Sequence, residues 1–476
     1  MTFIRQTTNH RAKRIRRGFT LIEALAVLFI FSVVSISFYQ TWTLSVRHML
    51  DARNRLGATA LANQKMEMVR SLDYDSIGTK APNGSGGWVY GIPAGDILQN
   101  ETVAASNATF SVHTFVQYVD DLYDGRLGGS PSDSIPTDYK RIRVTVSWGD
   151  ATESRQIALF ATVSPEGVES ASNTGVLSIN VLDATGTGVS GATVRVVNAA
   201  LSVDFSANTD ATGNLMIPGA AAGDRNYSLT VSKSDFFGVR TYPAAPASSF
   251  DPIDVHASVV VSTINQKSMI MDRSADITLR TEDPFGTALA DVDFQLKGGR
   301  QTGVVTGSNP AEPVYAFSVD EDTGGDGENE YGNESYGQYF FTLDIGETGY
   351  ALLRINPVPV AANKTQFEVL PGESKTARVV LMDKSIDSLF VTVTNSANGA
   401  AIPGATVRLR NATLGYDTTV SADVFGQVFF PTALPVLQPG TYDIETTASG
   451  YANEAGTVAV SSGGGLVLES VVLTAN

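Results

Sequence analysis

The chain has 476 residues, of which 43% are hydrophobic and 17% charged, a balance typical of folded proteins with several domains. The formal net charge of −16 argues against a nucleic-acid-binding surface, which needs clustered lysine and arginine. Because there is no cysteine, buried cores rather than disulfides must stabilise the domains.

Gly18 separates a basic segment from an apolar one. Lysine and arginine recur up to Arg17, whereas Glu23 is the only formal charge between Phe19 and Trp42. A run of about 20 apolar residues can cross a bilayer as a helix, and the basic flank predicts that its N-terminal side stays in the cytoplasm. A carboxylate at that depth costs about 2.5–3.5 kcal/mol on insertion scales, so Glu23 needs a specific role.

The residues Arg17-Gly-Phe-Thr-Leu-Ile-Glu23 resemble the class III signal of type IV pilins and type II secretion pseudopilins. The resemblance implies that a prepilin peptidase cuts between Gly18 and Phe19, that Phe19 is N-methylated, and that Glu23 is retained. A new α-amine with a pKa near ~8 is mostly protonated at neutral pH. Glu23 of a neighbouring subunit would neutralise it inside an apolar filament core.

Three other interpretations of this stretch stay open. Thr20 and Glu23 fit a helix capping box, which is compatible with filament assembly. The basic and apolar regions also fit an ordinary secretory signal, cut at Ser35-Ile-Ser37, or an anchor that is never cut.

A single long helix is expected after the leader. No proline occurs between Phe19 and Leu72, so one helix of ~80 Å can cover this range. Its first part, residues 19–42, would be the membrane or filament-core segment. In the second part, apolar residues recur at the spacing of one helix face, at Val46, Leu50, Gly57, Leu61, Met68 and Leu72.

Alternating apolar residues predict three strands after the helix. They fall at residues 110–118, 142–148 and 157–163, and a small antiparallel sheet packed on the helix would bury them. The fold class predicted for this N-terminal part is therefore α+β and pilin-like.

Internal repeats organise the rest of the chain. Met271-Asp-Arg-Ser-Ala-Asp276 recurs 111 residues later as Met382-Asp-Lys-Ser-Ile-Asp387, and Gly191-Ala-Thr-Val-Arg195 recurs as Gly404-Ala-Thr-Val-Arg408. A turn before a strand is expected three times, at Asp210–Gly213, Gly346–Gly349 and Asp423–Gly426. Short strands punctuated by turns predict three all-β sandwich modules.

These copies resemble the carboxypeptidase regulatory-like or Cna B-type domain, an Ig-like sandwich. Some members of that family form a lysine–asparagine cross-link, which is not expected here because the first strands contain no lysine. The predicted organisation is a leader at 1–18, a helix at 19–72, a β head at 73–169, a linker at 170–175, and Ig-like modules at 176–272, 273–383 and 384–476.

Little in the sequence points to catalysis. The four histidines have no serine or aspartate partner at a recognisable spacing, and neither a Cys/His cluster nor a phosphate-binding loop is present. We therefore predict a protein that is not an enzyme and needs no cofactor, with calcium as the one exception considered.

Two acidic loops offer the hard oxygen ligands that Ca²⁺ prefers. The calcium hypothesis is placed on Asp320, Asp322 and Asp326, and a second loop contains Asp120, Asp121, Asp124 and Asp133. Neither loop fits the EF-hand pattern, so a solvated acidic loop is the competing interpretation. Aromatic residues beside the first loop could form a contact patch or core: Tyr331, Tyr336, Tyr339, Phe340 and Phe341.

The resemblance implies a structural subunit of a type IV pilus-like surface filament. Three added modules would crowd a filament if every subunit carried them, so a minor or tip subunit is predicted. The expected partners are prepilin peptidase, the inner membrane before assembly and other pilin subunits, without nucleic acid. The expected location is a single pass through the cytoplasmic membrane and then the cell surface. The alternatives are an adhesin that binds a surface or cell ligand, a type II secretion pseudopilin, and an unassembled membrane-anchored stalk.

Overall fold

The structure is a computed structural model that describes residues 21–105, 108–123, 125–127, 129–130, 132–133, 135–149, 155–165, 173–344, 349–357, 364–433 and 436–476. The predicted leader lies outside these residues, as do residues 170–172 of the predicted linker, whose last two residues belong to a strand. The chain divides into two compact units. The first unit consists of Met1–Ala81, Ala94–Val116 and Lys140–Ser164. The second unit consists of Pro82–Pro93, Gln117–Tyr139 and Pro165–Asn476.

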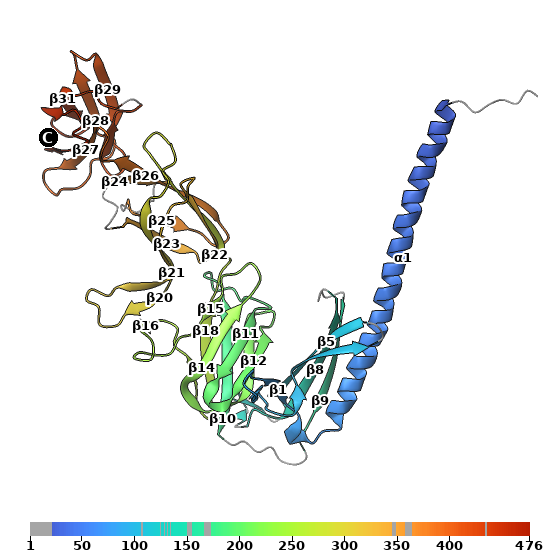
Figure 1. Cartoon of the computed structure of the whole chain (residues 1–476). Helices are drawn as coiled ribbons and strands as arrows, with labels where there is room; N and C mark the ends of the chain where they lie inside the picture. Colours follow the sequence, from blue (N-terminus) through green and yellow to red (C-terminus); the bar gives the residue numbers. More distant parts are fainter. Residues whose placement is uncertain are drawn as a thin grey trace, which may run out of the picture. The chain divides into compact units, whose positions relative to one another are not determined.

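One helix dominates the first unit. Helix α1 (Leu21–Arg70) runs without a break for 50 residues, which confirms the predicted single helix (Figure 1). At 1.5 Å per residue it is about 75 Å long. A short 3₁₀ turn, η1 (Tyr74–Ser76), follows it.

The C-terminal part of α1 packs on a four-stranded sheet with the order β4-β5-β8-β9. The strands are β4 (Asn100–Ala105), β5 (Ala108–Val119), β8 (Tyr139–Trp148) and β9 (Gln156–Val163). The three predicted strands are confirmed as β5, β8 and β9, and their inward residues form the core together with α1: Phe110, Val112, Val116, Ile142, Val144, Val146 and Trp148. A further parallel pair joins β1 (Thr79–Pro82) to β3 (Ile97–Leu98).

The buried face of α1 is shorter than the sequence pattern predicts. Leu61 is buried as expected, but Val46, Leu50 and Met68 are exposed. The first buried apolar residue of the helix is Ala58, next to Gly57, where an added Cβ would lie 3.1 Å from the Phe110 ring. Val46 and Leu50 lie before the part of the helix that packs on the sheet, whereas Met68 lies within that part but on another side of the helix from the buried Met66 and Val69.

The first sandwich of the second unit has two sheets. One has the order β13-β10-β18, with β10 (Thr174–Leu182), β13 (Asn214–Ala221) and β18 (Ile264–Ile270). The other contains β11 (Thr193–Asn198), β12 (Val203–Asn208), β14 (Gly223–Ser232), β15 (Val239–Arg240) and β17 (Ala257–Val259). A short strand from the predicted head range, β2 (Trp88–Tyr90), pairs in parallel with β12.

The middle sandwich repeats this arrangement. One sheet has the order β22-β19-β26-β24, with β19 (Ala275–Glu282), β22 (Glu328–Glu334), β24 (Tyr350–Asn356) and β26 (Ser374–Asp383). The other contains β16 (Phe250–Pro252), β20 (Asp293–Val305), β21 (Pro313–Asp322), β23 (Gly337–Leu343) and β25 (Gln366–Val369). Strand β16 lies in the range predicted for the first module, yet it pairs with β20.

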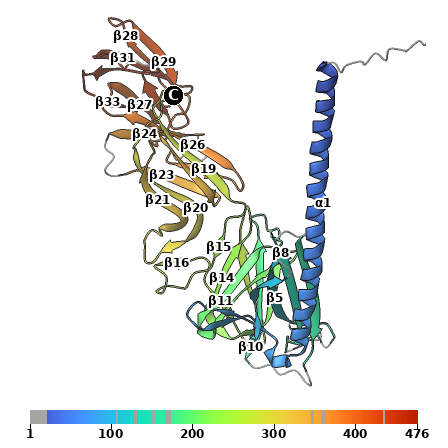
Figure 2. The same ribbon diagram turned by 45° about the vertical axis from the view of Figure 1, so that its right-hand side comes forward.

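The last sandwich has sheets with the orders β30-β27-β33 and β29-β28-β31-β32. Its strands are β27 (Ser388–Asn395), β28 (Thr406–Asn411), β29 (Tyr416–Ser421), β30 (Gln427–Phe430), β31 (Gly440–Thr447), β32 (Glu454–Val460) and β33 (Leu466–Leu473). Strands β28, β29 and β31 lie beside one another in both views (Figure 1, Figure 2).

All three sandwiches share one topological feature, a parallel pairing of their first strand with a late strand. The pairs are β10 with β18, β19 with β26, and β27 with β33. The predicted fold class is therefore confirmed: a long N-terminal helix packed on a small antiparallel sheet, followed by three all-β sandwiches. The predicted domain boundaries stay predictions.

Candidate functional site

The N-terminal half of α1 exposes a continuous apolar surface. An 18-residue window of the helix has a mean hydropathy of 2.4, and no residue of that window is buried. Large side chains such as Phe29 and Phe31 are more than two-thirds exposed, at 71% and 67%. By length and composition this helix can cross a membrane. An apolar surface of this extent requires a covering of lipid or of other helices.

Most serine and threonine hydroxyls in this half of the helix form a hydrogen bond within the helix itself. Ser32, Ser37, Thr41 and Ser45 each donate to a backbone carbonyl four residues earlier, at 2.8 Å. In a bilayer or an apolar filament core, a polar group without such a bond is costly. The segment therefore presents almost no unsatisfied side-chain hydroxyl to an apolar environment.

Glu23 lies in the first turn of α1 and is exposed. A carboxylate at this end interacts favourably with the positive end of the helix dipole. Gly18, Phe19 and Thr20 lie outside the described residues, so neither the predicted cleavage nor the capping box is tested by the structure. The roles of Gly18, Phe19 and Glu23 stay predictions.

A comparison with protein-family models finds the prokaryotic N-terminal methylation motif at residues 13–39. This match includes Gly18, Phe19 and Glu23 and the first part of α1. The chain therefore carries a prokaryotic N-terminal methylation motif, followed by C-terminal β-sandwich domains.

Other comparisons give weak likenesses only. No curated protein matches this chain. Among solved structures, the Bacillus anthracis TIE protein is 15% identical with a TM-score of 0.20, and the alignment covers 70% of this chain and 59% of that one. The streptococcal ancillary pilin is 13% identical with a TM-score of 0.18, covering 63% and 98%. BcpA, the major pilin subunit of Bacillus cereus, is 10% identical with a TM-score of 0.17, covering 63% and 99%. Because these three TM-scores are all below 0.5, the likenesses support no conclusion about the fold or function of this chain.

The acidic loop chosen for the calcium hypothesis contains a turn that recurs in the other sandwiches. In it, the N–H of Gly327 donates to the carbonyl of Gly324 at 2.8 Å. The same bond joins Gly213 to Asp210 at 3.1 Å and Gly426 to Asp423 at 3.0 Å. The middle sandwich therefore has this bond at Gly324–Gly327, and the predicted turn at Gly346–Gly349 stays a prediction. Residues 345–348 lie outside the described part of the chain.

The structure separates the three aspartates of that hypothesis. Asp320 and Asp322 lie on β21 with exposed side chains, and Asp326 lies in the turn, where its Oδ1 accepts from the N–H of Glu328 at 3.1 Å. Their carboxylates are not among the described groups whose oxygens come together within 4.8 Å. Calcium binding at these three residues stays a prediction.

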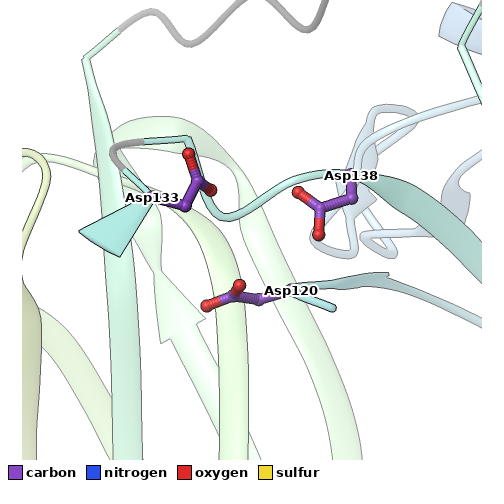
Figure 3. A group of neighbouring side chains, drawn as sticks. All are labelled: Asp120, Asp133 and Asp138. Atoms are coloured by element: carbon purple, nitrogen blue, oxygen red, sulfur yellow. The ribbon is translucent and has the colours of Figure 1, made fainter. Parts of the chain in front are cut away.

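Within the described residues, three other carboxylates do come together. Oxygens of Asp120, Asp133 and Asp138 lie within 4.8 Å of one another, and Figure 3 shows the side chains around one point. Asp120 follows β5, Asp133 lies in the short strand β7 (Ser132–Asp133), and Asp138 precedes β8. Such oxygens are the ligands of hard cations such as Ca²⁺. The sequence analysis named Asp120 and Asp133 in the second loop but missed Asp138. No sequence pattern links Asp138 to the other two.

Backbone groups hold these carboxylates in place. The N–H of Asp121 donates to Asp138 at 2.5 Å, the N–H of Leu127 to Asp120 at 3.2 Å, and the N–H of Ile135 to Asp133 at 2.9 Å. Asp138 is only 9% exposed. Each of the three carboxylates therefore accepts a hydrogen bond from a backbone N–H of the same segment.

The aromatic residues beside the acidic loop divide between core and partly exposed positions. Tyr339 and Phe341 are fully buried in the middle sandwich. Phe340 is half-buried on the other side of β23, with its ring 5.5 Å from that of Tyr315. The core interpretation is confirmed for Phe341, and the hypothesis of a contact patch was wrong for Tyr339, whose alternation with Phe340 places it inward.

The described histidines do not assemble a catalytic group with one another. His48 is exposed on α1, and His113 lies half-buried on β5, where burial and the neighbouring Arg143 lower its pKa. His256 bonds through Nδ1 with the hydroxyl of Thr241 at 2.8 Å, and burial lowers its pKa.

Proposed function

We propose that this pilin-like protein is a minor or tip subunit of a type IV pilus-like filament. The observation that carries the proposal is the methylation motif joined directly to a helix whose apolar half is unburied in the chain by itself. That half needs a covering, first of lipid and then of neighbouring helices. The three sandwiches would crowd a filament if every subunit carried them, which favours a minor or tip position.

The N-terminal residues have distinct roles in this proposal. Prepilin peptidase cuts between Gly18 and Phe19 at the membrane, and the new amine of Phe19 is methylated. Glu23 of an adjacent subunit then pairs with this amine in the filament. In apolar surroundings an ion pair that loses one partner destabilises the assembly by about 3–5 kcal/mol.

The N-terminal residue of the mature chain is the first test of this proposal. Mass spectrometry of the protein in its native host should find N-methylated Phe19 as the first residue. An N-terminus at Phe38 would instead support an ordinary secretory signal, and an intact Met1 or Thr2 would support an uncut anchor.

Incorporation of a Glu23→Gln variant is the second test. The variant should be cut normally, but its share in sheared fibres should fall by on the order of 100-fold, because the amine of its neighbour would lack a partner. Glu67→Gln is the matched control, since Glu67 lies on the same helix and is paired with Arg70 at 2.6 Å on the exposed surface. A normal share of the Glu23→Gln variant in fibres would contradict the proposed pairing.

Two alternatives share the same N-terminal signal. In a type II secretion pseudopilin, deletion of the gene would block protein secretion and leave surface fibres unchanged. In an unassembled stalk, sheared fibres would lack this chain while the membrane fraction retained it. An adhesin role is favoured by a separate observation, a cavity between the first and middle sandwiches.

A further inference from the structure

A cavity of about 320 Å³ opens between the first and middle sandwiches. Its walls come from β15 and the following loop on one side and from β20 and β21 on the other. This volume lies within the range of small-molecule sites, which occur preferentially between domains. It is large enough for one or two sugar residues.

The lining carries more positive than negative charge, although the whole chain has a net charge of −16. The lining includes two arginines, Arg240 and Arg300, and one carboxylate, that of Asp254. Both oxygens of Asp254 are already held, one by Arg300 at 2.7 Å and the other by Lys267 at 3.2 Å. Arg300 also donates to the carbonyl of Ile270. Lys267 and Arg300 together thus more than neutralise the charge of Asp254, and Arg240 adds a further positive charge to the lining.

Arg240 is placed to bind an anion. Its side chain is exposed, and its guanidinium lies 5.0 Å from the centroid of the Tyr242 ring. The Tyr242 ring is itself fixed by an edge-on contact with Phe250 at 5.2 Å. A guanidinium held over a ring can still offer its N–H fork to a carboxylate, which matches that fork in shape.

The other lining groups include both apolar and hydroxyl-bearing side chains. Phe237 and Tyr242 offer aromatic surfaces, and Thr230 and Thr302 offer hydroxyl groups. A sugar can use both kinds of group, because its C–H faces pack on aromatic rings while its hydroxyl edges form hydrogen bonds. We propose that this cavity binds an acidic saccharide, with Arg240 bound to the sugar carboxylate.

The test uses the full-length protein purified in detergent, so that it does not depend on filament assembly. Calorimetric titration with a tetramer of galacturonic acid should give saturable binding. The fully methyl-esterified tetramer, which keeps the sugar and loses the charge, should bind at least about tenfold more weakly, because a charge-assisted hydrogen bond is lost.

Two variants test the role of the cavity itself. Arg240→Gln should weaken binding of the acidic tetramer about tenfold or more, with an unchanged unfolding temperature because Arg240 is exposed. Arg410→Gln, which removes an exposed arginine from β28 in the last sandwich, is the matched control and should bind normally.

Four results would overturn the proposal: no binding of the acidic tetramer, equal binding of acid and ester, normal binding by Arg240→Gln, or equal competition by inorganic phosphate, which would indicate a simple anion site. None of these bears on the N-terminus of the mature chain, so failure here and failure of the filament proposal are distinguishable.

Discussion

A buried tyrosine with the same hydrogen bond recurs once in each sandwich. The hydroxyls of Tyr227, Tyr339 and Tyr442 donate to backbone carbonyls a few residues earlier, at 2.8, 2.6 and 2.8 Å. Burial is the main cause that raises the pKa of each phenol. Ig-like sandwiches use such a bond to fix the entry of a strand. The repeat in Tyr227 and Tyr442 is visible in the sequence, and the structure adds Tyr339.

Removal of one of these hydroxyls should therefore destabilise its sandwich. Tyr442→Phe leaves the carbonyl of Gln438 without its donor, which should cost about 1–3 kcal/mol of unfolding free energy. Urea unfolding of the purified protein would measure it. Tyr123→Phe, at a residue 98% exposed, is the control and should change nothing. Equal stability of Tyr442→Phe and the parent protein would show that the bond is not stabilising.

Lys140 is a buried cation in the core of the first unit. Its Nζ donates to the carbonyl of Tyr74 at 2.7 Å and lies 4.3 Å from the centroid of that ring. Burial lowers the pKa of Lys140 to about 8, opposed in part by Asp75. An unfolded lysine has a pKa near ~10.4, so the unfolded state binds more protons between these two values.

The unfolding free energy of the first unit should consequently rise with pH from about 8 towards about 10. Below about pH 8, Lys140 is protonated in both states and should add no pH dependence. Lys140→Met should abolish this part of the rise, because the neutral side chain has no proton to lose. Urea midpoints at about pH 7 and about pH 9.5, followed by tryptophan emission, would measure it. Lys65→Met, which removes the partner of Glu101, should keep the rise. An unchanged rise in Lys140→Met would contradict the argument.

At the scale of elements, α1 joins two environments in one helix. Its C-terminal part is held by the sheet of the first unit, and its N-terminal part has an exposed apolar surface. The first part belongs to the folded chain, whereas the second needs a membrane or a filament. Apolar side chains of the same type are therefore buried at one end of the helix and exposed at the other.

Two leucines on the helix separate these contributions. Leu61→Ala, at a residue 8% exposed, should lower the unfolding free energy of the first unit by about 2–5 kcal/mol. Leu50→Ala, at a residue 51% exposed, should leave it unchanged. Urea unfolding followed by the emission of buried Trp148 would compare the two. A similar loss in both variants would show that Leu50 is buried in the isolated chain.

At the scale of the whole molecule, the middle and last sandwiches share a second hydrophobic cluster. Leu353, Val380, Met382 and Phe390 form it, outside the two main cores. In addition, Phe285 and Phe429 meet edge to face at 6.3 Å. Shared burial of this kind couples the unfolding of neighbouring modules.

Phe390→Ala should uncouple these sandwiches. It removes the largest side chain of the cluster but leaves both main cores intact, so a shared calorimetric transition should split into two. Phe430→Ala, which lies in the core of the last sandwich and leaves the shared cluster intact, should instead lower the temperature of the shared transition without splitting it. A single sharp transition in Phe390→Ala would show that coupling arises elsewhere.

The sequence by itself determined the long helix and the three strands of the first unit, with the inward faces of those strands. The apolar run and the absence of proline predict α1, and period-two alternation predicts β5, β8 and β9 with their inward residues. These signals are local, because a helix or strand repeats its geometry every few residues. The methylation motif is also a continuous stretch of sequence, so it can be recognised without knowledge of the fold.

Only the tertiary structure decided which distant residues meet. It placed Asp138 beside Asp120 and Asp133, assigned the turn of the middle sandwich to Gly324–Gly327, and left Leu50 exposed. It also formed the cavity beneath Arg240 from two different sandwiches. Strand register and the contact between modules decide these relations, and neither leaves a short-range pattern in the chain.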